Sequence, residues 1–186
     1  MVIQHGVTLD QVWELTWQQI RLATVDNKHE FRYLTLATCH QHKPFQRTVV
    51  LRAVQNLSLF VFTDLRSDKV THLKKNNSSS LLFYSHQNKF QCRINSISSI
   101  HSNDDIAGKY IQQVRGNARL SYSSNLQPGQ SIENPETAFN WDDTLNFCVL
   151  KFDPFEIEIL QLIDHKHLRA RYTLADDKWQ GRWLQP

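Results

Sequence analysis

The chain has 186 residues, a length typical of one ordinary domain with a sizeable hydrophobic core. Its 21 basic and 18 acidic residues give a net charge of +3, with no basic tail and no block of like charge. This balance argues against a nucleic-acid-binding protein. No apolar run approaches the ~20 residues of a membrane span, and the first residues lack the pattern of a signal peptide. We therefore expect a single cytoplasmic domain over residues 1–186, without membrane contact.

Cysteine and histidine show no recognisable disulfide or metal pattern. An odd number of cysteines without a CxxC spacing argues against both a disulfide framework and a structural zinc site. Two loop-like histidine pairs, His40/His42 and His165/His167, have no converging acidic or cysteine partners in the sequence. We expect no metal site, and buried thiols at Cys39, Cys92 and Cys148.

The first expected element is a helix over Leu9–Ala23. Thr8 and Gln11 have the spacing of a capping box at its start. An apolar stripe with helical spacing follows, formed by Trp13, Trp17 and Ile20. Packing of this stripe on a sheet is the simpler interpretation of the two tryptophans, and an interface is the alternative.

Strands and short turns follow as far as residue 100. The segment after the helix alternates with period two, and a turn over His40–Gln46 that contains Pro44 separates it from the next strand. A helix over Ser67–Asn76 then interrupts the strands. The strands expected in this half are Phe31–Cys39, Arg47–Val54, Leu57–Phe62, Ser80–Ser85 and Phe90–Ile100.

The second half opens with an expected helix over Ser102–Arg115, for which Ser102 and Asp105 form a possible capping pair. Gly116–Thr144 is polar and contains prolines, which predicts a long irregular segment. Asp176-Asp177 is expected to form the turn of the last hairpin. The strands expected here are Asn146–Phe152, Pro154–Ile163, Leu168–Leu174 and Lys178–Leu184.

About eight strands with two or three inserted helices predict a mainly β protein, an antiparallel barrel with helical additions. A doubly wound α/β fold would need regularly alternating helices. The chain has only five glycines and no GxGxxG motif, so a dinucleotide-binding fold and a P-loop are both poor interpretations.

The strongest local signal is the start of the helix that follows Phe62. Ser67 is a suitable N-cap, and a helix N-terminus offers free N–H groups and a partial positive charge to an anion. Arg66 and Lys69 add two cations, and Thr63 and Ser67 add hydroxyl groups at the same corner. This combination predicts a phosphate site, and a solvated helix start is the alternative. Tight binding would also require an apolar or aromatic body, which the sheet beside Phe62 could accept.

Two arginines precede this corner on the strand Arg47–Val54. Arg47 and Arg52 are five residues apart, so an ideal strand points them to opposite faces. Either one serves the ligand while the other forms a salt bridge, or a bulge re-aims one of them.

Downstream, Gln91 could pair with the edge of a heterocycle. Arg169 and Arg171 alternate on one face, as an anion clamp or as a solvated exterior.

The order of the motifs RTVVLR, LFVFTDLRSDK, LLFY and FQCRI resembles the pyridoxamine 5'-phosphate oxidase-like flavoproteins, which are FMN-binding split barrels. The chain is most similar to the broader branch with TDxRSxK. The resemblance implies FMN at the interface of a homodimer. The implied cofactor-binding residues are Arg47, Thr48, Val49, Val50, Leu51, Arg52, Phe62, Thr63, Arg66, Ser67, Lys69, Gln91 and Arg171.

Within this set the resemblance implies particular roles. Arg47 and the strand it begins run along the flavin, and Arg66, Ser67 and Lys69 hold its phosphate. Asp68 stands where the vitamin B6 oxidases have a second basic residue, which places more weight on Arg66. The opposite subunit contributes Gln91. Ser123 and Ser124 match another cofactor loop only loosely.

The substrate residues of the B6 oxidases match less well. His167-Leu168-Arg169 occupies the position of their Arg-x-His, and Arg52 replaces a lysine that contacts substrate. Only Arg115 and Arg119 are candidates for the basic substrate-phosphate loop. The expected function is therefore an FMN-dependent oxidoreductase acting on an unidentified small molecule, with no catalytic residue assigned. The alternatives are a true pyridoxamine/pyridoxine 5'-phosphate oxidase and a non-catalytic flavin-binding module.

Overall fold

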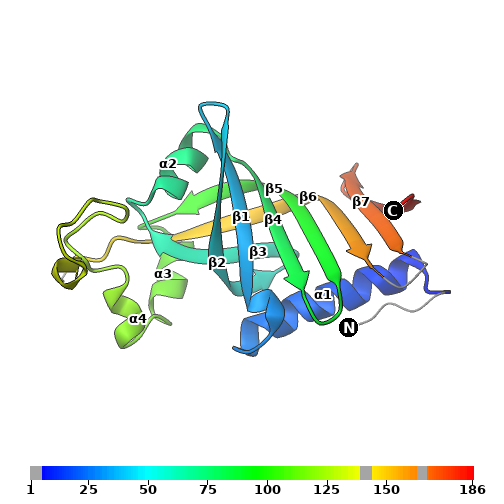
Figure 1. Ribbon diagram of the computed structural model, residues 1–186, viewed down its shortest axis with the longest axis horizontal. Coiled ribbons are helices and arrows are strands. Elements are labelled where there is room, and N and C mark those ends of the chain that lie inside the picture. The colour runs from blue at the N-terminus through cyan, green and yellow to red at the C-terminus, as the bar shows by residue number, and fades with distance from the viewer. Residues whose placement is uncertain (1–5, 139–143, 163–166) are drawn as a thin grey trace.

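The computed structural model describes residues 6–138, 144–162 and 167–186, which form one antiparallel sheet with helices at its margins (Figure 1). The strand order is β3-β2-β1-β4-β5-β6-β7-β8. Because β3 also pairs with β6, the first six strands of this order close into a barrel. The strands are β1 (Tyr33–His40), β2 (Lys43–Gln55), β3 (Ser58–Asp64), β4 (Ser78–Ser85), β5 (Phe90–His101), β6 (Phe147–Gln161), β7 (Leu168–Ala175) and β8 (Lys178–Leu184).

The expectation of a mainly β antiparallel barrel with helical additions is confirmed. One end of β6 pairs with β3 and closes the barrel, while its other end pairs with β7. The β7–β8 hairpin therefore extends the sheet outside the barrel. Asp176 and Asp177 form its turn with positive φ angles of 48° and 58°, as the sequence predicted.

Helix α1 (Leu9–Val25) begins beside β7 and runs beneath the barrel towards the start of β1 (Figure 1). The capping box of Thr8 and Gln11 is present at its start. Trp17 is 1% exposed and belongs to the main core, whereas Trp13 packs against the rings of Tyr172 and Trp179 on the terminal hairpin. The tryptophan stripe therefore packs on the sheet. None of the helices in the described ranges is long and apolar enough to cross a membrane.

The strand boundaries expected at two prolines were wrong. The first turn is confined to Gln41 and His42, and Pro44 already belongs to β2. It is tolerated because this half of β2 pairs with β1 alone among the described strands, so a missing N–H on the other side breaks no ladder. Pro154 does not divide β6, because a register shift opposite Asn95 and Ser96 accommodates it. Ile163, the expected end of that strand, lies outside the described residues.

The helices of the second half also differ from the prediction. α3 (Asp105–Ile111) is shorter than expected and is capped by Asp104, whose carboxylate accepts the N–H of Ala107, so Ser102 and Asp105 do not form the cap. The segment expected to be irregular contains α4 (Asn117–Leu120) and the 3₁₀ turn η2 (Pro135–Ala138), and residues 139–143 lie outside the described part. Another 3₁₀ turn, η1 (Glu30–Arg32), precedes β1 and includes Phe31, which was expected in the strand.

Two hydrophobic clusters define the two faces of the barrel wall. Leu36, Leu51 and Val61 belong to the larger cluster, inside the barrel. Phe60 and Tyr110 belong to the smaller one, which lies on the outer face where the α3 region covers β3 and β6. Successive side chains of β2 and β3 therefore point alternately into the barrel and towards α3.

Candidate functional site

Hydrogen bonds link the side chains at the junction between β3 and α2 (Asp68–Lys75). The Lys69 ammonium donates to the Thr63 hydroxyl at 3.0 Å, and the Ser67 hydroxyl donates to the Asp64 carbonyl at 2.8 Å. The two hydroxyls are 3.3 Å apart. Because Ser67 has already used its one proton, Thr63 donates to Ser67. Ser67 is the N-cap as predicted, but it makes no side-chain capping bond, so the first N–H groups of α2 stay uncapped by it.

Arg47 reaches the same corner from β2. Its Nη1 donates to the Thr38 hydroxyl at 2.7 Å and to the carbonyls of Leu36 and Phe45 at 3.2 and 3.3 Å. All three bonds use one nitrogen, which leaves Nε and Nη2 without a partner among the residues that the structure describes. We call Arg47, Thr63, Ser67 and Lys69 the cationic corner.

Burial disfavours the charge of both cations of the corner. Burial, followed by the positive charge of Arg47, lowers the pKa of Lys69, and Asp64 and Asp68 only partly oppose this. Burial likewise lowers the pKa of Arg47, and the charge of Asp68 opposes this. Neither cation has a hydrogen-bonded carboxylate in the described part of the chain. A bound anion would relieve the repulsion, so the corner is suited to a phosphate.

Arg66 was expected to hold a phosphate, but its side chain binds a carboxylate and two loop carbonyls. Its guanidinium forms a two-pronged ion pair with Asp64, with distances of 3.1 and 2.7 Å. The same side chain donates to the carbonyls of Ser124 and Leu126 at 2.8 and 3.2 Å. Gln127 returns a bond to the Arg66 carbonyl at 3.1 Å. Arg66 therefore ties residues 124–127 to the end of β3, and Asp64 balances much of its charge.

Arg47 and Arg52 lie on opposite faces of β2. The ladder with β3 shifts between Leu51 and Ala53, so Arg52 is the extra residue of a bulge. Its guanidinium carbon lies 5.8 Å from the centre of the Phe62 ring, and it also affects the pKa of Tyr122, which burial raises and Arg52 lowers. The bulge does not bring the two arginines together. Arg52 faces the aromatic cluster on the outer face, and its Nε is buried without a partner in the described ranges.

The other residues of the RTVVLR motif contribute differently. The side chains of Val49 and Leu51 are buried in the barrel core, so they cannot contact a ligand outside it. From Lys43 to Val50, one edge of β2 has no paired strand within the described residues. Backbone N–H and C=O groups along this edge, including those of Thr48 and Val50, are therefore available to a planar ligand.

Gln91 and Arg171 lie on another part of the molecule. Thr63 of the corner pairs with Cys148 of β6, whereas Arg171 and Gln91 pair with Glu158 and Leu160, ten and twelve residues further along the same strand. Ten residues of extended strand correspond to roughly 30 Å. Figure 1 also shows β7 at the end of the molecule opposite α2. A single copy of the chain therefore does not bring these two residues to the cationic corner.

The surroundings of Arg171 form a compact charged cluster around Glu158. This carboxylate is 3% exposed and accepts from Arg169 and Arg171, each at 2.7 Å through Nη2, while Arg93 approaches to 3.3 Å. Burial opposes ionisation, but the hydrogen bonds from Arg171 and Arg169 lower the pKa of Glu158 below its usual value. The three arginines contact two carboxylates, those of Glu158 and, at 3.7 Å from Arg171, Glu156, so the cluster keeps a net charge of +1.

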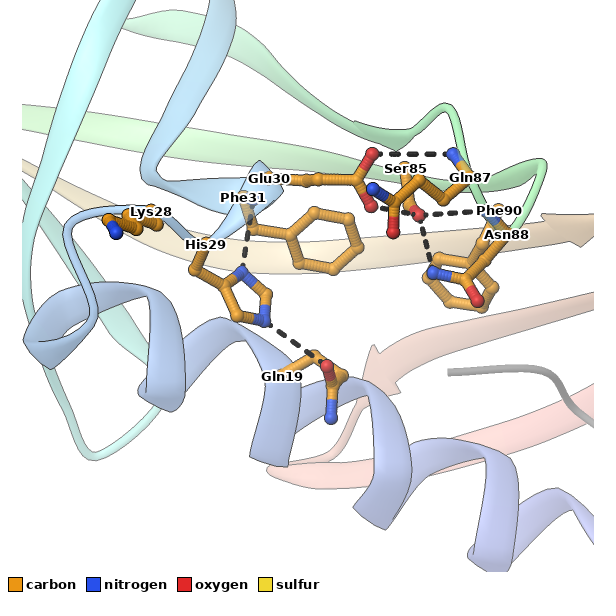
Figure 2. A pocket seen from close by; sticks show the side chains of 9 residues that line it. All are labelled: Gln19, Lys28, His29, Glu30, Phe31, Ser85, Gln87, Asn88 and Phe90. Atoms are coloured by element: carbon orange, nitrogen blue, oxygen red, sulfur yellow. Dashed lines mark hydrogen bonds between the residues drawn. The ribbon is translucent and has the colours of Figure 1, made fainter.

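A separate cavity of about 220 Å³ lies between α1, η1 and the β4–β5 turn (Figure 2). Glu30 accepts bonds there from the Ser85 hydroxyl and from the N–H groups of His86 and Gln87. His29 is engaged through both ring nitrogens, with the Phe31 N–H and the Gln19 amide. These polar groups satisfy one another, and none of the expected cofactor residues lines the cavity.

The structure adds residues that the sequence analysis missed. Thr38 contacts Arg47, and the carbonyl of Leu126 contacts Arg66. The carbonyl of Ser124, a residue that the sequence matched only loosely to a cofactor loop, contacts Arg66 as well. The one available signal for Thr38 was its place in the inward-facing series with Leu34 and Leu36, where a polar side chain needs a partner. The loop carbonyls left no signal, because backbone groups are the same in every residue.

Comparisons with known proteins identify the family of this chain. Residues 11–102 match the family model "Pyridoxamine 5'-phosphate oxidase, FMN-binding domain". A pyridoxine/pyridoxamine 5'-phosphate oxidase of Vibrio cholerae is 36% identical over 173 residues, covering 82% of this chain and 79% of that protein. The corresponding enzyme of Shewanella pealeana is 25% identical over 169 residues, covering 82% and 78%.

Solved structures show the same fold. A pyridoxamine 5'-phosphate oxidase-related, FMN-binding protein of Nostoc punctiforme superposes with a TM-score of 0.77 at 23% identity, covering 97% of this chain and all of that one. PhzG of Burkholderia lata, solved with tetrahydrophenazine-1-carboxylic acid, gives 0.76 at 18% identity, covering 94% and 92%. The chain thus has the split-barrel fold, and it belongs to the pyridoxamine 5'-phosphate oxidase FMN-binding domain family.

Proposed function

We propose that this protein binds FMN and acts as an FMN-dependent oxidoreductase on a small molecule. The observation that carries the proposal is the cationic corner beside an open edge of β2. Within the described residues, the corner has two partly buried cations without a hydrogen-bonded carboxylate, two hydroxyls and a helix start that Ser67 does not cap, and this combination suits a phosphate dianion. The neighbouring strand edge can accept the planar part of the same ligand.

The residues present fit FMN in distinct roles. Arg47 and Lys69 hold the phosphate, Thr63 and Ser67 orient Lys69, and the edge of β2 lies along the flavin. Arg66 keeps residues 124–127 at the end of β3. When bound, the flavin supplies the hydride and electron chemistry, and the protein supplies binding and orientation.

A second copy of the chain completes the site in this proposal. Gln91 and Arg171 pair with β6 at least ten residues away from the corner, too far to reach the same ligand within one copy. A homodimer in which each subunit presents them to its partner's flavin accounts for both the distance and the positive charge around Glu158.

The decisive test is the absorption spectrum of the purified protein, with mass analysis of the released ligand. A flavin spectrum and the mass of FMN are expected, together with a dimer by light scattering. A colourless protein that does not bind added FMN would contradict the proposal. A protein that binds FMN but is inert towards reductants and candidate substrates would instead be a flavin-binding module.

True pyridoxamine/pyridoxine 5'-phosphate oxidase is the second candidate, because the Vibrio cholerae relative with 36% identity carries that name. The residues for substrate are less favourable: Arg115 and Arg119 are exposed, and Arg169 is paired with Glu158. Rapid peroxide formation from pyridoxamine phosphate and oxygen would support this candidate. No peroxide, combined with rapid reduction of the holoprotein by NADPH, would favour another reductase.

Arg66→Ala separates a loop-holding role from a phosphate-binding role. The substitution leaves the buried Asp64 carboxylate unpaired and releases the bonds to residues 124 and 126, so we expect a loss of roughly 2 kcal/mol in unfolding free energy. FMN and riboflavin should then weaken by similar factors in fluorescence titrations. Selective weakening of FMN would show that Arg66 is a phosphate ligand, as the resemblance implied. Arg66→Lys, which keeps the charge without the fork, is the matched control.

A further inference from the structure

Thr38 connects Arg47 to a residue outside the expected site. Its hydroxyl lies 2.7 Å from Arg47 Nη1 and 3.1 Å from Nδ1 of His72, in α2. Thr38 and His72 are 4% and 6% exposed, so water does not readily replace either bond. The hydrogen-bonded series Arg47–Thr38–His72 thus joins β2, β1 and α2 next to the cationic corner.

The direction of these two bonds follows from counting protons. Arginine can only donate, so Thr38 accepts from Arg47. The one proton of Thr38 then needs an acceptor, and Nδ1 of His72 is the partner that the described residues provide. His72 accepts it as a neutral ring whose proton is on Nε2. In this state the Thr38 lone pairs face Arg47.

The surroundings of His72 favour the neutral ring. Burial is the largest effect that lowers its pKa; the charges of His40, on β1, and Arg47, on β2, add to it, and Asp68 of its own helix opposes them. Protonation would place a proton on the nitrogen that receives the Thr38 bond. It would also add a third cation near Arg47 and Lys69.

Packing holds the His72 ring in place. It stacks on His40 with a centroid distance of 4.8 Å and an interplanar angle of 6°, and the Phe45 ring lies 4.5 Å away. Lys69 and His72 are three residues apart, so they share one side of α2. α2 therefore supplies Lys69 to the cationic corner and His72 to the hydrogen bonds that end at Arg47.

We propose that His72 is a positioning residue for the phosphate site: through the Thr38 hydroxyl, it fixes the guanidinium of Arg47 in the orientation that binds the FMN phosphate. This inference rests on the proposed function. It assigns His72 no contact with the cofactor. Substitution of His72 should therefore weaken the binding of flavins that carry the phosphate and spare those that lack it.

Two substitutions of His72 separate its hydrogen bond from its packing. His72→Phe keeps a ring that can stack on His40 but has no acceptor. His72→Asn loses the ring but can place an amide oxygen where Nδ1 lies. Thr38→Val removes the hydroxyl with little change of shape. Thr16→Val is the matched control, because Thr16 is also a buried threonine, and its hydroxyl donates within α1 to Val12.

The test measures dissociation constants for FMN and riboflavin on the full-length variants by fluorescence titration, with thermal unfolding to verify folding. His72→Phe and Thr38→Val should each weaken FMN roughly tenfold while changing riboflavin by less than about twofold. His72→Asn should restore most of the FMN affinity, and Thr16→Val should leave it unchanged. The double variant Thr38→Val/His72→Phe should be no weaker than either single variant, since both break one path.

The possible failures are distinct. Unchanged FMN binding in folded His72→Phe and Thr38→Val would overturn the inference while leaving the proposed function intact. Equal weakening of FMN and riboflavin, or no rescue by asparagine, would show that His72 only supports the fold. A wild-type protein that binds neither flavin would overturn the proposed function, and this inference with it.

Discussion

Lys69→Ala should weaken FMN on the order of 50- to 100-fold while leaving riboflavin nearly unaffected. The reason is that Lys69 has no hydrogen-bonded carboxylate in the described residues and donates only to Thr63 there, so its charge is available to the phosphate. Riboflavin lacks that phosphate. Flavin fluorescence titrations of both ligands measure the ratio directly.

Lys75→Ala is the matched control for this experiment. Lys75 is an exposed lysine at the other end of the same helix, so its removal changes the net charge equally without touching the corner. The assignment of Lys69 would be wrong if both lysine variants had the same effect. It would also be wrong if Lys69→Ala weakened riboflavin as much as FMN.

Glu158→Ala should lower the unfolding free energy by roughly 2–3 kcal/mol at neutral pH. The substitution leaves three guanidinium groups close together without the buried carboxylate that separates them. The estimate is below that for a fully buried pair, because the arginine side chains are 28–39% exposed and solvent screens them. Urea denaturation measures the loss. Glu156→Ala is the control, since its contact with Arg171 is longer, at 3.7 Å.

The same carboxylate predicts a pH dependence of stability. Its pKa is lower in the folded chain than the usual 4.5, so the unfolded chain binds the proton more readily. The stabilisation is therefore complete above the usual carboxyl pKa and is lost as the pH falls through the folded value. Glu158→Gln should reduce the acid-side slope of stability against pH. An unchanged slope would show that Glu158 contributes little to the acid response.

Much of the fold could be predicted from the sequence because its signals are local. The period-two strands, the capping box of Thr8 and Gln11 and the Asp176-Asp177 turn each depend on residues close together in the chain. The proline errors have the opposite cause. Whether Pro44 and Pro154 end a strand depends on an unpaired edge and on a bulge, and both are properties of the neighbouring strand.

Part of the candidate site likewise follows from residues that are close together in the chain. Thr63, Ser67 and Lys69 lie within seven residues, and a strand followed by a helix brings them together without help from the rest of the chain. The opposite faces of Arg47 and Arg52 also follow from strand periodicity, and the bulge does not reverse them. These features needed only short-range geometry.

The sequence by itself thus determined the barrel class, the helix start with its cations and the family pattern of motifs. Only the tertiary structure decided which partners those cations have. Arg66 pairs with Asp64 and with a loop about 60 residues away, and Arg47 connects through Thr38 to His72. Such partners depend on register across the barrel and on loop backbone, and the identity of a residue does not specify either. The corner seen in the sequence is therefore built on contacts that only the folded chain brings together.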